Sequence, residues 1–270
     1  MKITFIGGGN MANALIGGLL KQGFSAADIT VVEPLAESRA RLSAGFGVAC
    51  LAASDASILG SDVLVLSVKP QQMREALAPL AGKLKDQLIV SIAAGMRLAD
   101  ISRWLGGHAK LVRTMPNTPA LIGAGITGLY ADPSIDGEAR RQAERILGAV
   151  GKTLWIADES LMDAVTAVSA SGSAYVFYFI EALRDAARAL GFSEEHAGLL
   201  AIETVVGSAA LAVGSEEDVS VLRQRVTSKG GTTEAALNSL DADGFKAVIL
   251  RAVKAADARG RELGDLLGKR

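Results

Sequence analysis

Short apolar runs alternate with amphipathic segments over the first 156 residues. The runs are rich in β-branched residues and apolar on consecutive positions, as in DVLVLSV and QLIVSI, which is typical of strands covered on both faces. Strands that alternate with helical patterns indicate a parallel sheet with crossover helices. We therefore predict an α/β fold with a doubly wound sheet, whose strands lie at Ile3–Ile6, Ile29–Val32, Val63–Val68, Leu88–Ile92 and Leu111–Met115.

The pattern changes after about residue 158. Long segments rich in Ala, Leu and Glu show helical periodicity at Ala174–Leu190, Glu194–Val213 and Gly244–Leu267. We predict an α/β domain over residues 1–157 and an all-helical domain over 158–270. The segment LLAIETVVGSAALAV is apolar around much of its circumference, which predicts burial on more than one side. A second subunit would supply that burial, and a self-contained helical bundle is the alternative.

Composition narrows the function classes. The chain has 270 residues, half of them hydrophobic, and a formal net charge of -1, with no long basic stretch, so we expect no nucleic-acid partner. A single cysteine, Cys50, excludes an intrachain disulfide, and two histidines cannot assemble the usual zinc-ligand spacings, so we expect no metal site. Because we find neither a signal-like segment nor an uninterrupted apolar stretch near the roughly 20 residues of a membrane helix, we expect a cytoplasmic protein without a membrane partner.

A glycine loop follows the first predicted strand and opens a helix, in the pattern G-x-G-x-x-A. Its first glycine allows a tight turn, its second lets the backbone approach a pyrophosphate, and the final alanine permits close packing of helix on strand. The N-terminus of the helix presents free N–H groups to phosphates. We predict a Rossmann-type site for a nicotinamide dinucleotide at Ile6, Gly7, Gly8, Gly9, Asn10, Met11 and Ala12.

Glu33 ends the second strand, where an acidic residue accepts hydrogen bonds from the ribose hydroxyls of the cofactor. That position favours NADH over NADPH. Alternatively, Glu33 is only a polar residue before Pro34, and Arg39 or Arg41 neutralises a 2′-phosphate. The sequence leaves the choice between NADH and NADPH open.

Two further turns follow predicted strands and fall at the carboxyl edge of the sheet, where open α/β sheets bind ligands. We expect them to line the nicotinamide half of the cofactor site. A Lys-Pro pair is also common where a strand ends in a turn. The backbone of Lys69 is therefore a better candidate for a cofactor contact than its ammonium group. The residues are Ser67, Val68, Lys69 and Pro70 in the first turn and Ala93, Ala94 and Gly95 in the second.

Two stretches are more particular than a generic fold requires: VRTMPNTP at residues 112–119 and VTSKGGTTE at residues 226–234. With the glycine loop, they resemble pyrroline-5-carboxylate reductases, the enzymes that reduce a cyclic imine to proline in the last step of proline biosynthesis. The resemblance covers essentially the whole chain. It is carried by FIGGGNMANALIGGL, LSVKPQ, SIAAG, VRTMPNTPALIG, DAVTAVSASGSAYVF and VTSKGGTTEAAL.

The second stretch has small side chains, a flexible turn and a helix start, which together make a receptor for a substrate carboxylate. The alternative is a plain loop in which Thr232 or Thr233 caps the helix. The resemblance implies that Thr233 lies near the ring nitrogen, and Thr233 or a bound water is our candidate proton donor. It implies substrate contacts at Glu216, Ser228, Gly230, Gly231, Thr232 and Thr233, and cofactor contacts at Ser54 and Arg225, where relatives have asparagine.

One motif departs from the family pattern. Ala170 and Ser173 replace a glycine and a helix-starting proline of the family, so we expect local loosening without loss of function. The two histidines are poor candidates for the chemistry, because His108 lies in a GGH turn and His196 at a helix start.

Two other functions compete. The β-hydroxyacid dehydrogenases share the glycine loop and a helical domain, but they use a lysine in the helix after a glycine motif, and here the helix from Ser173 has Glu181 and Arg184 but no lysine. The second alternative is a cofactor-binding sensor or scaffold without catalysis. The apolar helices predict a homodimer, and the resemblance implies higher assemblies built from dimers, including decamers.

Overall fold

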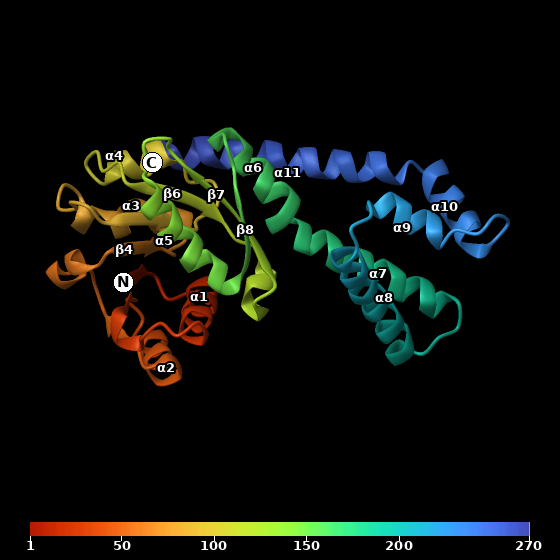
Figure 1. Cartoon of the computed structure of the whole chain (residues 1–270), viewed down its shortest axis with the longest axis horizontal. Coiled ribbons are helices and arrows are strands. Elements are labelled where there is room, and N and C mark those ends of the chain that lie inside the picture. The colour runs from red at the N-terminus through yellow and green to blue at the C-terminus, as the bar shows by residue number, and fades with distance from the viewer. Residues whose placement is uncertain (270) are drawn as a thin grey trace. The chain divides into compact units, whose positions relative to one another are not determined.

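The computed structural model describes residues 1–269, which form two compact units (Figure 1). The first unit comprises Met1–Ser171 and the C-terminal segment from Ala255, and the second comprises Gly172–Lys254. These units differ from the domains predicted with a boundary at residues 157 and 158. The segment from residue 158 to Ser171 and the end of the last helix both pack with the α/β unit. Their side chains contribute to the core and the ion pairs of that unit.

Eight strands of the described chain form one sheet, in the order β3-β2-β1-β4-β5-β6-β7-β8. Neighbouring strands are parallel except for the antiparallel pair β6 and β7. The strands are β1 (Ile3–Ile6), β2 (Ile29–Val32), β3 (Ala49–Leu51), β4 (Val63–Leu66), β5 (Leu88–Ser91), β6 (Leu111–Met115), β7 (Gly125–Ala131) and β8 (Gly151–Trp155).

The five predicted strands are present, although β4 and β5 end one or two residues earlier than expected. The sequence analysis missed β3, β7 and β8. Of these, β3 has only three residues, and both β3 and β8 are edge strands with mixed exposed and half-buried positions. Such strands lack the continuous apolar run that identifies a strand covered on both faces.

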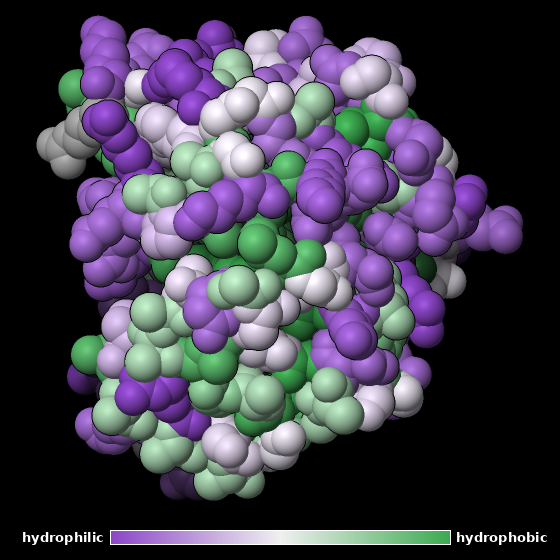
Figure 2. All heavy atoms as spheres, turned by 90° about the vertical axis from the view of Figure 1, so that its left-hand side faces the viewer, coloured by the Kyte–Doolittle hydropathy of each residue, from purple (hydrophilic) through white to green (hydrophobic). Residues whose placement is uncertain are grey.

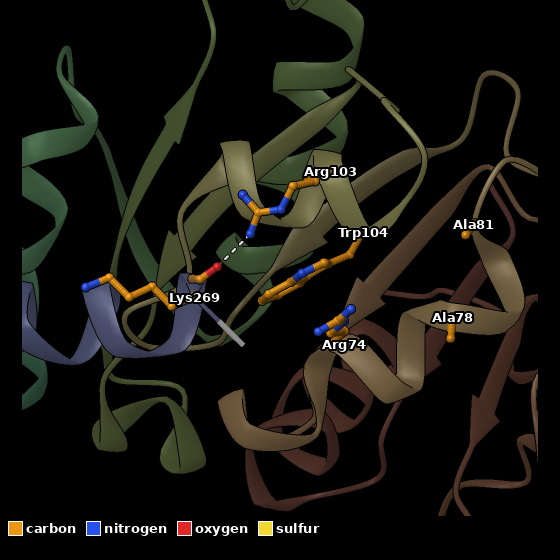
Figure 3. Close-up of a pocket in the computed structure, with 7 residues that line it drawn as sticks. Arg74, Ala78, Ala81, Arg103, Trp104 and Lys269 are labelled. Carbon is orange, nitrogen blue, oxygen red and sulfur yellow. Dashed lines mark hydrogen bonds between the residues drawn. The ribbon is translucent and has the colours of Figure 1, made fainter.

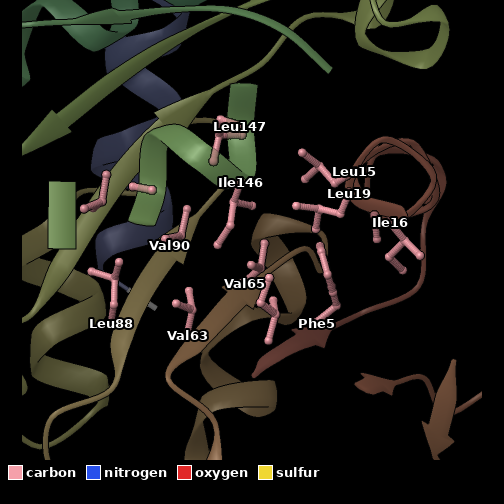
Figure 4. Close-up of a cluster of buried hydrophobic side chains, with 14 of the residues drawn as sticks. Phe5, Leu15, Ile16, Leu19, Val63, Val65, Leu88, Val90, Ile146 and Leu147 are labelled. Carbon is pink, nitrogen blue, oxygen red and sulfur yellow. The ribbon is translucent and has the colours of Figure 1, made fainter. Parts of the chain in front are cut away.

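Side chains that alternate along the strands form a separate core on each face of the sheet. On one face, Phe5, Val65 and Val90 pack with residues of α1 and α5, including Leu15 and Ile146 (Figure 4). The opposite core contains Leu64, Leu66 and Ile89 from the strands together with Met73, Leu77, Ile101 and Leu267. The sheet is therefore covered by helices on both sides, as a doubly wound fold requires.

Helices α1 to α6 of the first unit range from four residues in α6 to 12 in α1. On the face shown in Figure 2, hydrophilic and hydrophobic side chains are mixed, with the hydrophobic ones mainly in its centre and lower part. The helices are α1 (Asn10–Lys21), α2 (Ala36–Phe46), α3 (Met73–Leu77), α4 (Leu98–Trp104), α5 (Gly137–Leu147), α6 (Met162–Val165) and the C-terminal part of α11 (Phe245–Gly268).

The C-terminal part of α11 is fixed to the α/β unit by several contacts. Leu267 is buried in the core of the unit, and Arg97 pairs with Asp265 at 2.6 Å. Arg103 donates to the carbonyl oxygen of Gly268 at 2.6 Å (Figure 3). These contacts explain why residues from Ala255 onward belong with the sheet and not with the helical unit.

The second unit contains only helices in its described residues, as predicted for this half. It contains α7 (Gly172–Ala189), α8 (Glu194–Gly214), α9 (Val219–Arg225), α10 (Thr232–Ala242) and the first part of α11. Helices α7 and α8 pack against each other as a hairpin (Figure 1). They leave large apolar side chains exposed, among them Phe177, Tyr178, Leu199, Val206 and Leu211.

Helix α8 bears on the expectation that the chain has no membrane helix. By length and composition alone, its 21 residues are sufficient to cross a membrane. The expectation concerned an uninterrupted apolar stretch, and Glu203 is a charged residue within the otherwise uncharged part of α8 that follows its first turn. A helix that packs against a second subunit has the same composition, because both environments favour apolar side chains around the helix.

Candidate functional site

The glycine loop between β1 and α1 has the geometry of a phosphate cradle. Gly7 has φ +104°, and a Cβ there would lie 2.7 Å from the carbonyl oxygen of Ser67, so the position requires glycine. Gly9 is exposed with open space around it, and it caps α1 without any side-chain hydrogen bond. The first N–H groups of α1, beginning at Asn10, therefore have no side-chain cap. Uncapped N–H groups beside an open glycine fit the pyrophosphate of a dinucleotide.

Asn13 holds this loop, and the sequence analysis missed it. Its side-chain amide donates to the carbonyl oxygens of Gly8 and Gly9, both at 2.8 Å. An asparagine in the first turn of a helix is a recognisable signal of such local bonding, because its side chain reaches nearby backbone groups. Met11 and buried Ala12 complete the first turn of α1, and the small Ala12 lets the helix pack on the strand as predicted.

Glu33 lies at the carboxyl end of β2 and contacts the glycine loop. Its Oε2 accepts a hydrogen bond from Gly8 N–H at 3.0 Å, and its Oε1 accepts one from Leu35 N–H at 2.9 Å. Arg39 donates to the carbonyl oxygens of Glu33 and Pro34 at 2.8 and 2.7 Å. The acid predicted for the ribose thus has a second task, which is to hold the loop, and Arg39 lies beside it.

The half-buried thiol of Cys50 lies in the same region, on β3. Its pKa is raised by burial, and the nearby Arg39 guanidinium opposes that rise. A raised pKa keeps the thiol protonated and unreactive near neutral pH.

The other cofactor candidates of the first unit lie at neighbouring strand ends. Ser67 follows β4, and its hydroxyl donates to Gly7 O at 2.7 Å, which ties the two turns together. Lys69 has an exposed side chain and an extended backbone before a short helical turn that starts at Pro70. The structure thus brings the carboxyl ends of five adjacent strands to one edge, with Ile6 on β1, Glu33 after β2, Ser54 after β3, Ser67–Pro70 after β4 and Ala93–Gly95 after β5.

The order of the strands reverses between β1 and β4, which makes this place at the edge a topological switch point. β1 lies between β2 and β4, so the connections from β1 and from β4 leave in opposite directions along the sheet. Open α/β sheets bind ligands in the crevice that such a reversal creates. The residues present therefore fit a nicotinamide dinucleotide.

A buried ion-pair network supports the turn after β5. Arg113 on β6 is 3% exposed and pairs with Asp163 at 2.7 Å and Glu159 at 3.3 Å. Glu159 also accepts the Leu98 N–H at 2.9 Å, at the start of α4. The sequence analysis placed Arg113 in a distinctive stretch but gave it no partner, because its partners lie 46 and 50 residues further along the chain.

The Pro-Asn-Thr-Pro turn after β6 is held in place by a hydrogen bond to the next strand. Asn117 Oδ1 accepts the Ile126 N–H at 2.9 Å, which joins the turn to the start of β7. His108 contacts the carbonyl oxygen of Gln87 at 2.8 Å. Both contacts stabilise loops of the α/β unit.

In the second unit, the VTSKGGTTE stretch forms a glycine turn before α10. Gly230 has φ +74°, and Gly231 caps the helix without a side-chain hydrogen bond. Thr232 and Thr233 are therefore the first two residues of α10, so the alternative in which either threonine caps this helix is wrong. Glu234 reaches back to accept the Gly230 N–H at 2.7 Å. The first turn of α10 presents N–H groups that fit a carboxylate.

The remaining predicted residues of this unit lie just before that loop. Glu216 is exposed, and Arg225 ends α9 and pairs with Glu217 at 2.6 Å. Asp218 caps α9, and hydrogen bonds from the Ser220 side chain and backbone lower the pKa of its carboxyl group. Arg225, predicted to contact the cofactor, thus has an acidic partner within its own unit.

The segment that departs from the family motif is helical. Residues Thr166–Ala170 form a π-helical segment, and the Ser171 N–H donates to Thr166 O at 2.9 Å. Ala170 therefore lies within a wide helical turn, where an alanine is well tolerated. His196 is exposed in the first turn of α8.

Comparison with known families matches both halves of the chain. Residues 159–263 match the family described as pyrroline-5-carboxylate reductase dimerisation, and residues 2–95 match NADP oxidoreductase coenzyme F420-dependent. The first match supports the prediction of a homo-oligomer. Together with the fold, the second confirms the prediction of a nicotinamide-dependent oxidoreductase.

Individual relatives agree with these matches. A pyrroline-5-carboxylate reductase of Pseudomonas aeruginosa is 47% identical over 269 residues, covering 99% of this chain and 98% of the relative. A solved pyrroline-5-carboxylate reductase from Coxiella burnetii has a TM-score of 0.93 and 39% identity, covering 97% of this chain and 98% of the other. A Plasmodium falciparum pyrroline carboxylate reductase with NADP bound has a TM-score of 0.85 and 28% identity, covering 98% of each chain. Because the similarity extends over nearly the full length at this identity, the chain belongs to the pyrroline-5-carboxylate reductase family.

Proposed function

We propose that this chain reduces 1-pyrroline-5-carboxylate to L-proline with NADH or NADPH. The observation that carries the proposal is the pair of helices, α1 and α10, that begin after a glycine without a side-chain cap. Each offers backbone N–H groups to an anion, and the reaction needs two anionic groups held, the pyrophosphate of the cofactor and the carboxylate of the substrate.

The first unit holds the cofactor in this proposal. Gly9 and the first turn of α1 bind the pyrophosphate, and Glu33 accepts hydrogen bonds from the adenosine ribose. The turns at Ser67–Pro70 and Ala93–Gly95 line the nicotinamide, with Ser54 and Arg225 as further contacts. When bound, the reduced nicotinamide supplies a hydride to the imine carbon.

The second unit holds the substrate. Ser228 and the backbone from Gly230 to Thr232 bind the carboxylate, and Glu216 borders the site. Thr233 lies in the first turn of α10 and is half-buried. In this proposal its hydroxyl donates a hydrogen bond to the ring nitrogen. Protonation of that nitrogen makes the imine carbon a better hydride acceptor.

Orientation is the main contribution of the protein. Alignment of two reactants supplies on the order of 7 to 11 kcal/mol, so the site works without a strongly acidic side chain. The helical region over residues 158–270 is proposed to combine substrate binding with dimerisation, whereas residues 1–157 bind the cofactor.

The proposed assembly is a homodimer, or a larger assembly built from dimers, in the cytoplasm. Exposed apolar side chains on α7 and α8, such as Phe177 and Leu199, supply the contact surface. Sedimentation of the purified chain at micromolar concentration is expected to give a dimer or a multiple of it, and a monomer would contradict this part of the proposal.

The activity is tested by following nicotinamide oxidation at 340 nm with 1-pyrroline-5-carboxylate as substrate. We expect substrate-dependent oxidation, and no reaction with 3-hydroxy acids and the oxidised cofactors. Tight cofactor binding without substrate-dependent oxidation would favour a sensor, and turnover of 3-hydroxy acids would favour a β-hydroxyacid dehydrogenase.

A further inference from the structure

The peptide group that joins Gly8 to Gly9 is held on one side and free on the other. Its carbonyl oxygen, Gly8 O, accepts a hydrogen bond from the side-chain amide of Asn13 at 2.8 Å. Its N–H, which belongs to Gly9, has no hydrogen-bond acceptor among residues 1–269. Because Gly9 is exposed, this N–H is a donor available to a ligand.

The side chain of Asn13 sets the direction of that donor. No peptide bond among residues 1–269 is cis, and in a trans peptide the N–H points opposite to the C=O. Asn13 supplies the only hydrogen bond that Gly8 O accepts within the described chain, so the Gly9 N–H points away from the Asn13 amide. The direction of the Gly9 N–H therefore depends on one side chain.

The amide of Asn13 is itself fixed. Its second hydrogen bond goes to Gly9 O, also at 2.8 Å, and Gly9 O accepts the backbone N–H of Asn13 at 3.0 Å in the first turn of α1. An asparagine amide has two N–H donors, and both are used here. Because the helix holds Gly9 O, the amide is anchored at that atom and holds Gly8 O from there.

The loop needs such a restraint because it contains three consecutive glycines, Gly7, Gly8 and Gly9. Glycine loses more conformational freedom on ordering than any other residue. Glu33 fixes the other side of Gly8, since its Oε2 accepts the Gly8 N–H at 3.0 Å. Asn13 and Glu33 thus order Gly8 before a ligand arrives, which lowers the entropy lost on binding.

We propose that Asn13 is a positioning residue that directs the Gly9 N–H toward the pyrophosphate of the cofactor. This inference rests on the proposed function, which assigns the glycine loop to the cofactor. Asn13 acts through the peptide between Gly8 and Gly9 and does not itself contact the phosphates. Without its amide, that peptide rotates more freely and the loop binds pyrophosphate less tightly.

The inference is tested by titrating Asn13→Ala and Asn13→Asp with NADH and with ADP-ribose, which keeps the pyrophosphate but lacks the nicotinamide. Loss of two hydrogen bonds is expected to raise both dissociation constants about tenfold in Asn13→Ala. Asn13→Asp keeps the size of the side chain, but its carboxylate only accepts hydrogen bonds and repels the carbonyl oxygens of Gly8 and Gly9, so we expect a larger increase. Binding of adenosine, which has no phosphate, should not change.

Steady-state kinetics separates positioning from a general loss of structure. We expect the KM for NADH to rise about tenfold in Asn13→Ala, with kcat at saturating NADH and the KM for 1-pyrroline-5-carboxylate unchanged. A variant that is only less stable would instead lower the apparent kcat, since less of the protein is folded. It would leave the KM for NADH and the dissociation constants unchanged.

Gln22→Ala is the matched control, because Gln22 follows the last turn of the same helix and its side-chain amide donates to a backbone carbonyl oxygen, Gly148 O, at 3.3 Å. It should leave every dissociation constant unchanged. Wild-type constants in both Asn13 variants would overturn the inference and leave the proposed function standing. An equal weakening of adenosine and ADP-ribose would also overturn it, because the effect would then not involve the pyrophosphate. A wild-type chain that does not bind NADH would contradict both the inference and the proposed function.

Discussion

The carboxylate of Glu33 accepts a hydrogen bond from the backbone N–H of Gly8 at 3.0 Å. This bond joins the residue proposed to contact the adenosine ribose to the loop proposed to hold the pyrophosphate. We therefore expect Glu33 to affect both the choice of cofactor and the shape of the loop.

Replacing Glu33 with serine is expected to shift cofactor preference from NADH toward NADPH. The carboxylate repels a 2′-phosphate, and its removal leaves Arg39 to attract that group. We expect the ratio of kcat/KM for NADPH to that for NADH to rise about tenfold or more, which is about 1.4 kcal/mol. Glu37→Ser, an exposed acid of the next helix, is the control. An unchanged ratio would remove Glu33 from cofactor selection.

Replacing Thr233 with alanine is expected to lower kcat about a hundredfold, because a positioned proton donor contributes on that order. Thr233→Ser keeps the hydroxyl and should restore most of the activity. Steady-state kinetics with 1-pyrroline-5-carboxylate measures both variants. If Thr233→Ala turns over at the wild-type rate, a bound water is the donor.

Alanine substitutions at two adjacent glycines of α1 are expected to have different effects on the stability of the fold. A Cβ at Gly18 would overlap the carbonyl oxygen of Ala149, so Gly18→Ala should destabilise the fold by about 1 to 3 kcal/mol despite the better helix propensity of alanine. At Gly17 the nearest atom is 3.4 Å away on the Phe46 ring, so Gly17→Ala should be neutral or stabilising. Urea unfolding measures the free energy of unfolding of both variants. Equal changes in the two variants would show that the close contact at Gly18 does not determine the cost of the substitution.

Breaking the buried network at Arg113 is expected to cost about 3 to 5 kcal/mol of unfolding free energy, because Arg113→Met leaves Asp163 charged, buried and unpaired. The same substitution at Arg141, which pairs with Glu138 on the surface, should cost about 0 to 1 kcal/mol. Chemical denaturation compares the two. A cost for Arg113→Met as small as that for Arg141→Met would contradict the importance of the network.

The N-cap of α5 predicts a pH dependence of stability. A hydrogen bond from the Ala139 N–H lowers the pKa of the Asp136 carboxyl group below its unfolded value of about 3.9. The charged cap therefore stabilises the fold above that pH, and its contribution is lost as pH falls through the folded-state pKa. The stability gap between the wild type and Asp136→Asn should be constant above about pH 5 and narrow below about pH 4. Asp86→Asn, an exposed loop aspartate, is the control.

Features encoded within a few neighbouring residues were predictable. The apolar runs of β1, β2, β4, β5 and β6 identify strands because a strand covered on both faces has few polar positions. The glycine loop at Gly7–Ala12 is likewise local, since its turn, its open glycine and its helix start follow one another. The long helices of the second half follow from their periodicity and their composition.

The tertiary structure decided what depends on residues far apart in the chain. The edge strands β3 and β8 form because a neighbouring strand supplies hydrogen bonds, which no local pattern indicates. Gly8 and Glu33 are 25 residues apart, and Arg113 finds Asp163 only because β6 and α6 pack together. The sequence by itself determined the fold class and the family, whereas packing determined which charged side chains are paired, because pairing depends on distance in space.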